Sequence, residues 1–226
     1  MHKTLAFGLL AMGLPVWAGR PVSTDDASVN DRGICQLEGW VDRANDARHS
    51  HIAPACGVYD GLELGAEWDL PAPASVAQHG ISASLKWAPE FLGWNGWRFG
   101  AKAGLVTEKA FGETERHFGH WTALALASYP INDRWTIHLN LGHSHPQIPV
   151  EKATTYGGAL VYAINDRTMA FAEWQGDSRT PATRVVGVRW WLLSDVLGLD
   201  LTTSEGNATP HSRGWGLGLG WYGLHF

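Results

Sequence analysis

The feature of this chain that most limits its fold is a strict alternation with a period of two residues. In segment 215–221 every odd position holds tryptophan or leucine, and every even position holds glycine. Successive side chains of a β-strand point to opposite faces, so one face of this segment is bulky and apolar while the other carries no side chains. A strand with lipid on one side and a crowded interior on the other requires this pattern.

The alternation recurs upstream, in apolar sets that begin at Leu62, Ile81, Trp97, Trp135 and Val186. After the first residues, no segment has the roughly 18 uninterrupted apolar residues that a membrane helix needs, so only a closed barrel could span a bilayer. Polar and charged residues occupy the opposite parity, and we predict that these line the lumen: Glu63, Glu67, Lys86, Arg98, Lys102, His138, Glu173 and Arg189.

Short turns are predicted at 130–134, 165–167 and 194–195, and barrels of the outer membrane place such turns in the periplasm. Longer connections alternate with them and are expected outside the cell: 71–77, 107–116, 144–152, 176–181 and 204–213. Both chain ends of the barrel then lie on the periplasmic side, which requires an even number of strands. With a first hairpin from 35–43 and 49–56, we predict an all-β transmembrane antiparallel barrel of about 12 strands over residues 35–226.

The aromatic residues agree with this topology. The chain has thirteen tryptophans, and most fall near predicted strand ends, as in the two aromatic girdles of a membrane barrel. A soluble periplasmic barrel or sandwich is the competing fold, but its outer face would be polar. The parity changes between Trp221 and Phe226, so a β-bulge near Gly223 is expected.

Residues 1–18 have a lysine near the start, an apolar run and Val16-Trp17-Ala18, which is typical of a cleavable signal peptide. The following segment, 19–34, is too polar to span lipid. We predict that it lies in the periplasm, and the alternative is that it folds into the lumen.

Cys35 and Cys56 are the two cysteines of an exported chain, so a disulfide between them is expected. The predicted topology places both at the periplasmic end of the first hairpin, where a disulfide could close it.

Several stretches resemble one family of proteobacterial proteins. They are 20–27, 35–40, Leu139–His143, Phe171–Glu173 and Arg189–Asp195, and they resemble the meta-pathway phenol degradation family of outer-membrane transporter-like barrels. The resemblance implies a channel or transport role, for example for small aromatic compounds, without established catalytic residues.

The lumen set mixes carboxylates, which also include Glu38, Asp42 and Asp69, with cations. Buried charges persist when they are paired or solvated. One alternative is therefore an interior filled by ion pairs, and the other is a charged constriction in a narrow pore.

Histidines concentrate in or beside the predicted outer loops, where His79 and His211 also lie. Neutral imidazole is a common ligand of zinc and copper, so loops that converge over the barrel mouth could form a metal site or a proton-sensitive gate. The candidate ligands come as close pairs: His49 with His51, His117 with His120, and His143 with His145.

The stretch His143-Ser144-His145 has the residue types of a hydrolase site. Adjacent strand residues point to opposite faces, which makes a pair of His143 with Ser144 unfavourable unless the chain has already entered a loop there, and we predict no catalytic residues. A lipid-modifying hydrolase remains the enzymatic alternative.

We therefore expect an integral outer-membrane channel of a Gram-negative cell that passes small solutes, with a closed structural or ligand-binding barrel as the alternative. Its expected partners are outer-membrane lipid, the barrel assembly machinery and small solutes. The formal net charge of −5 gives no reason to expect nucleic acid. No cofactor is expected apart from zinc or copper at the outer loops.

Overall fold

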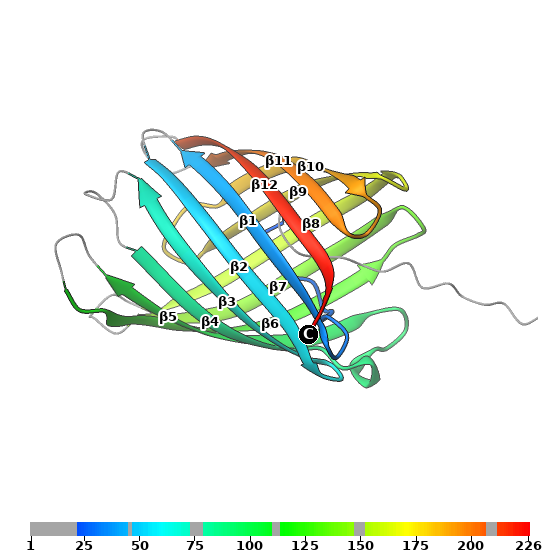
Figure 1. The fold of residues 1–226 in the computed structure, drawn as a ribbon, viewed down its shortest axis with the longest axis horizontal. Helices are drawn as coiled ribbons and strands as arrows, with labels where there is room; N and C mark the ends of the chain where they lie inside the picture. The colour runs from blue at the N-terminus through cyan, green and yellow to red at the C-terminus, as the bar shows by residue number, and fades with distance from the viewer. Residues whose placement is uncertain (1–21, 45–46, 73–78, 110–113, 147–151, 207–211) are drawn as a thin grey trace, which may run out of the picture.

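The computed structural model describes residues 22–44, 47–72, 79–109, 114–146, 152–206 and 212–226. These residues form twelve antiparallel strands that close into one barrel, since β1 pairs with both β2 and β12 (Figure 1). The predicted fold class is confirmed. The strands are β1 (Ile34–Ala44), β2 (Ala47–Tyr59), β3 (Leu62–Ala72), β4 (His79–Trp87), β5 (Arg98–Lys109), β6 (His117–Pro130), β7 (Trp135–Pro146), β8 (Ala153–Asn165), β9 (Thr168–Asp177), β10 (Thr183–Leu193), β11 (Leu197–Gly206) and β12 (Ser212–His225).

The two ends of the barrel differ in their connections. One end, here called the short-turn end, carries the start of β1, the C-terminus and the connections 60–61, 131–134, 166–167 and 194–196. The β4–β5 connection at this end is longer and contains the 3-10 helix Glu90–Leu92. The opposite end, called the long-loop end, carries the other connections. Among the described residues no helix is long and apolar enough to cross a membrane.

The strands present apolar side chains outward and small or polar ones inward. In β12, Trp215, Leu217, Leu219 and Trp221 are about half exposed, while the glycines between them are buried. In a membrane barrel, lipid covers such an apolar outer face. The alternation that predicted this strand therefore corresponds to its two environments.

The glycines of β12 make room for large side chains on the inner face. A Cβ on Gly218 would lie 3.3 Å from the Cβ of Trp40 and 3.4 Å from that of Asp200. Trp40 and Tyr222 are both buried inside the barrel. The expected bulge is present, because the β1–β12 register shifts between Cys35 and Leu37 and Gly223 has a φ of +71°.

The disulfide between Cys35 and Cys56 is formed, as predicted. The two residues are direct partners in the β1–β2 pair, at the short-turn end. The disulfide therefore closes the first hairpin next to the point where the chain enters β1.

The chain before β1 corrects one prediction. Residues 22–33, here called the lumen segment, enter the barrel interior, where Thr24, Asp26 and Ala27 are buried, while Asp31 and Arg32 are exposed where the segment approaches β1. The expectation of a segment in the periplasm does not hold for these residues, and the alternative, folding into the lumen, is what is observed. The predicted signal peptide, 1–18, lies outside the described residues.

The crowded interior makes a prediction about two glycines. A Cβ at the inward Gly187 would lie 2.7 Å from the Leu201 carbonyl oxygen and 2.5 Å from the Phe171 ring, whereas one at the outward Gly158 would lie 3.6 Å from Leu139. We expect Gly187→Ala to lower the free energy of unfolding by about 1–3 kcal/mol, because overpacking displaces neighbours. Urea titration of the barrel in lipid vesicles measures this, with Gly158→Ala as the control. Equal stabilities of the two variants would contradict the account.

Candidate functional site

One side of the lumen is closed by a cluster around Arg189, which is fully buried. Its guanidinium donates from Nε and Nη2 to the two carboxylate oxygens of Asp200, at 2.7 Å each. The guanidinium also lies over the rings of Trp191 and Tyr222, and the Tyr222 hydroxyl donates to Glu38. Buried charges held by paired partners and planar contacts are costly to separate, so this side is a fixed wall.

Apolar packing closes the adjacent part of the interior. Phe171, Val185 and Ala159, from β8 to β10, form a buried cluster with Val22 of the lumen segment. The start of the lumen segment is thus held by burial of apolar surface.

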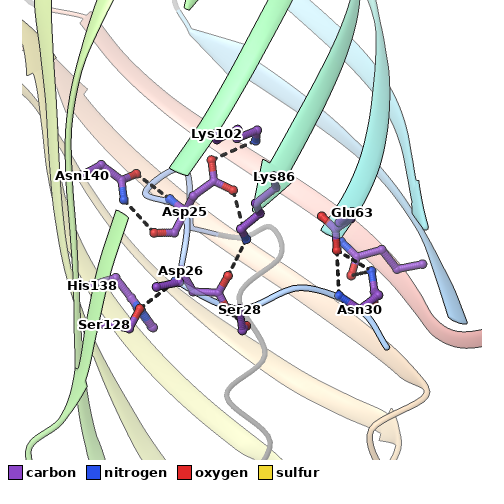
Figure 2. A network of polar contacts seen from close by, with 12 residues as sticks. Asp25, Asp26, Ser28, Asn30, Glu63, Lys86, Lys102, Ser128, His138 and Asn140 are labelled. Atoms are coloured by element: carbon purple, nitrogen blue, oxygen red, sulfur yellow. Dashed lines mark hydrogen bonds and ion pairs between the residues drawn. The ribbon is translucent and has the colours of Figure 1, made fainter. Parts of the chain in front are cut away.

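The rest of the lumen segment is held by charge. Lys86 donates to Asp26 at 2.6 Å and lies 3.6 Å from Asp25, while Lys102 contacts Asp25 at 2.9 Å (Figure 2). Lys86 and Asp26 are nearly completely buried. Two consecutive carboxylates therefore neutralise two lumen lysines that would otherwise face one another across the β4–β5 pair.

Backbone amides of the same segment are satisfied by side chains of the wall. The amide and hydroxyl of Thr24 donate to Glu173. The backbone amide and the side-chain amide of Asn30 each donate to Glu63 at 2.9 Å. The amide of Asp25 donates to Asn140 at 2.8 Å.

A further contact extends this network to a buried histidine. The Ala27 amide donates to the Ser128 hydroxyl at 2.9 Å, and that hydroxyl lies 2.8 Å from Nδ1 of His138 (Figure 2). An irregular segment can be buried because wall side chains satisfy its polar groups in this way.

Wall glycines provide the space that the segment occupies. A Cβ on Gly157 of β8 would lie 2.7 Å from the Thr24 hydroxyl, and one on Gly57 of β2 would overlap the carbonyl oxygens of Asn30 and Asp31. The lumen segment and the barrel wall are thus complementary in shape at both ends of the segment.

Asp25 is charged in this setting. Burial raises the pKa of its carboxyl, but the attraction of Lys102 and Lys86 outweighs burial, so the pKa lies below its ordinary value. A carboxyl with a lowered pKa stabilises the folded arrangement at neutral pH, and this contribution is lost as the pH falls through that pKa.

Cavities lie on both sides of the segment. One of about 310 Å³ borders Val22–Asp25 and is lined by Glu67 and Lys102, towards the long-loop end. Another, of about 580 Å³, borders residues 27–32 and is lined by Arg98 at the short-turn end. The two share no lining residue, because the lumen segment lies between them.

The predicted lumen-lining residues divide by their contacts. Glu63, Lys86, Lys102 and Glu173 hold the lumen segment, and Arg189 belongs to the fixed wall. Glu67 lines the cavity on the long-loop side, and Arg98 is exposed at the short-turn end.

His138 is buried against Ser128. Sequence reasoning missed Asp25 and Asp26 as lumen residues. The available signal was a pair of adjacent carboxylates before β1, together with lysines predicted inside the barrel.

The structure does not bring the six candidate metal ligands together at one place. His49 and His51 point into the lumen near the long-loop end, where they contact Asp69 and Glu67. His143 and His145 point outward and lie against Trp121, at ring distances of 6.0 and 5.5 Å.

The remaining pair, His117 and His120, does not join His49 and His51 in one cluster. His117 is exposed, and His120 lies 3.7 Å from Glu108. The barrel wall separates the inward pair from the outward pair, so they cannot bind the same ion. His211 lies outside the described residues.

Ser144 shares the inward parity of His138 and Asn140, whereas both adjacent histidines lie on the outer face. Nucleophilic catalysis needs a base within hydrogen-bond reach of the serine. The stretch His143-Ser144-His145 therefore does not form a catalytic pair.

Solved structures with similar folds are outer-membrane barrels. The KdgM porin aligns with a TM-score of 0.66 at 11% identity, covering 84% of this chain and 99% of KdgM. Its complex with disordered oligogalacturonate gives 0.67 at 10% identity, with the same coverage. Omp33 of Acinetobacter baumannii gives 0.56 at 8% identity, covering 84% of this chain and 97% of Omp33. At these identities the likeness shows the fold, which is that of porin-like outer-membrane barrels.

The chain belongs to a family described as "Uncharacterised conserved protein UCP029691", whose model matches residues 6–221. No curated protein matches the sequence significantly. The match is not to the meta-pathway phenol degradation family, so that resemblance stays a prediction.

The contacts of the lumen segment predict its hydrogen exchange. The amides of Thr24, Asp25, Ala27 and Asn30 should exchange slowly in the folded barrel, because each donates to a wall side chain. Replacing Asp25 and Asp26 by Asn should speed their exchange by roughly 10- to 100-fold, since hydrogen bonds to charged groups contribute about 1.5–3 kcal/mol. Mass spectrometry of the segment measures this, with Asp166→Asn in an exposed turn as the control. Fast exchange in the unmodified barrel would contradict the docked segment.

Proposed function

We propose that this protein is an outer-membrane channel for small polar solutes, and that the lumen segment closes it. The observation that carries the proposal is the nature of the closure: over residues 25–30, polar side chains rather than apolar packing hold the segment. Water can replace polar contacts, so such a closure can open at lower cost than an apolar core of the same size.

The difference between the two sides of the lumen indicates which path a solute would take. The Arg189 cluster and the Phe171 cluster fix the side formed by β8–β12. The side formed by β2–β6 carries the polar cavities and the lysines that hold Asp25 and Asp26. Displacing residues 25–30 would join the two cavities along this side.

The exposed wall would then carry both signs of charge. Lys86 and Lys102 would face the passage together with Glu63 and Glu67, and rings of charged side chains set the selectivity of narrow pores. Because the lysines already bind two carboxylates of the segment, an anionic group of a solute could take the same place.

The identity of the solute belongs to the same proposal. The meta-pathway resemblance implies small aromatic compounds, whereas one solved neighbour is the KdgM porin in complex with disordered oligogalacturonate. The anionic site made by Lys86 and Lys102 favours an acidic solute over a neutral aromatic one. Adding galacturonate oligomers or benzoate to one side of the bilayer and recording current block separates the two classes.

The location is part of the proposal as well. Residues 1–18 would direct export as a signal peptide and then be cleaved. The barrel assembly machinery would insert the chain into the outer membrane, with its short-turn end in the periplasm. A permanently closed structural barrel is the second candidate, favoured by the filled lumen. Conductance distinguishes it from the channel.

Planar-bilayer recordings test the channel directly. The unmodified barrel should show rare openings, and the double variant Asp25→Asn with Asp26→Asn should raise the open fraction about tenfold, which corresponds to about 1.4 kcal/mol. Asp166→Asn should leave it unchanged. If a folded barrel that lacks residues 19–30 and the double variant both give no current steps, the channel proposal is wrong and the closed barrel stands.

A further inference from the structure

Three neighbouring strands bring imidazoles and carboxylates together at the long-loop end of the lumen. Asp42 of β1, His49 and His51 of β2, and Asp69 of β3 lie on inward-facing positions of adjacent strands. His49 and His51 are two residues apart on one strand, which places both rings on the same face.

Each histidine has a carboxylate partner on β3. Nδ1 of His49 lies 2.9 Å from Oδ1 of Asp69, and Nδ1 of His51 lies 2.9 Å from Oε1 of Glu67. An ionised carboxylate only accepts hydrogen bonds, so a neutral His51 that donates from Nδ1 to Glu67 keeps its lone pair on Nε2. A carboxylate that fixes the tautomer of a metal-binding histidine in this way is a common second-shell arrangement.

The free nitrogen of His51 faces further carboxylates across a gap. Nε2 lies 3.8 Å from Oδ2 of Asp42 and 3.8 Å from Oδ1 of Asp69, which is too long for a hydrogen bond. A cation between these atoms would be ligated by nitrogen and oxygen and would relieve the repulsion between the two carboxylates.

The histidine is also held in position. The indole of Trp40 stacks on the His51 ring, with centroids 4.5 Å apart and planes 7° from parallel. His51 is mostly buried, whereas the His49 and Asp69 side chains are about one-third exposed, so an ion could enter from solvent.

We propose that His49, His51 and Asp69 bind one divalent transition-metal ion, with zinc as the expected ion and Asp42 as a nearby fourth ligand. The ligand atoms of the first three residues lie within 4.8 Å of one another. A tetrahedral zinc site needs separations of roughly 3.4 Å, so shifts of about 1 Å complete the site. Two imidazoles favour zinc or copper over calcium or magnesium, which prefer oxygen ligands alone.

Metal binding at this site can be tested whether or not the barrel conducts ions. It lies at the long-loop end of strands β1–β3, whereas the lumen segment is held by other side chains, among them Gln36, Glu63, Lys86 and Glu173. The outward pair His143 and His145 has the same spacing on a strand but faces away from the lumen, and it therefore serves as a matched control.

Zinc binding to the refolded, disulfide-intact barrel tests the proposal by competition with a fluorescent chelator. We expect one saturable site, loss of at least about 30-fold in affinity for His49→Gln with His51→Gln, and no change for His143→Gln with His145→Gln. The Asp69→Asn variant should also bind at least about tenfold more weakly. Losing an outer-shell partner typically costs 10- to 100-fold, so Glu67→Gln should retain a weaker site.

Copper provides a second readout. The electron paramagnetic resonance spectrum of bound Cu²⁺ should show hyperfine splitting from two nitrogens, and the splitting should vanish in the His49, His51 double variant. Heat-modified gel migration establishes that each variant is folded. Absence of saturable zinc binding, or unchanged binding in both the double variant and Asp69→Asn, would overturn the proposal.

Discussion

The pairing of Asp25 and Asp26 with Lys86 and Lys102 is the interaction on which the character of this barrel depends. The outer face of the strands is apolar, so the inward charges have only water or one another as partners. Here the segment before β1 supplies the opposite charges. Without that segment, two lysines would face a polar cavity, whereas with it the two ends of the lumen are separated.

The two sides of the lumen therefore differ in what fills them. On one side Arg189 is fully buried and bound by Asp200, and its neighbours Trp191 and Tyr222 cover the guanidinium. On the other side an irregular segment is bound by side chains that water could also satisfy. The first arrangement stiffens the barrel, and the second is where movement costs least. The histidine site at the long-loop end borders the same polar side, because Trp40 and Glu67 contact His51 and also line the cavity there.

The fold could be predicted because a lipid face imposes a local period of two. The alternation around Leu217 and Gly218 indicates both the strand and its orientation, and short turns then determine the topology. The disulfide was expected from the two cysteines of an exported chain, and the topology placed both at the same end of the first hairpin. The lumen segment could not be predicted in the same way, because a polar stretch such as 22–33 has no periodicity, and only its tertiary partners distinguish the lumen from the periplasm.

The histidine pairs lie on opposite faces of the barrel wall for a reason that the sequence contained. His143 and His145 continue the outward parity of Leu139 and Leu141, but β7 was expected to end earlier, and loop residues carry no parity. Strand β7 runs to Pro146, so both rings stay on the outer face. His49 and His51 have the opposite, inward orientation. The ends of strands are hard to locate from a sequence. In a barrel, an error at a strand end changes the face to which the last side chains are assigned.

The most direct test of the account is a nuclear Overhauser measurement on the isotope-labelled barrel in detergent micelles, between the Thr24 methyl group and the Gly157 α-protons. These groups adjoin in the structure, since a Cβ on Gly157 would lie 3.4 Å from the Thr24 methyl carbon. The account predicts a strong cross-peak, together with dispersed resonances for residues 22–33. Sharp, random-coil resonances for these residues without the cross-peak would contradict it, because the lumen would then be open and its lysines unpaired.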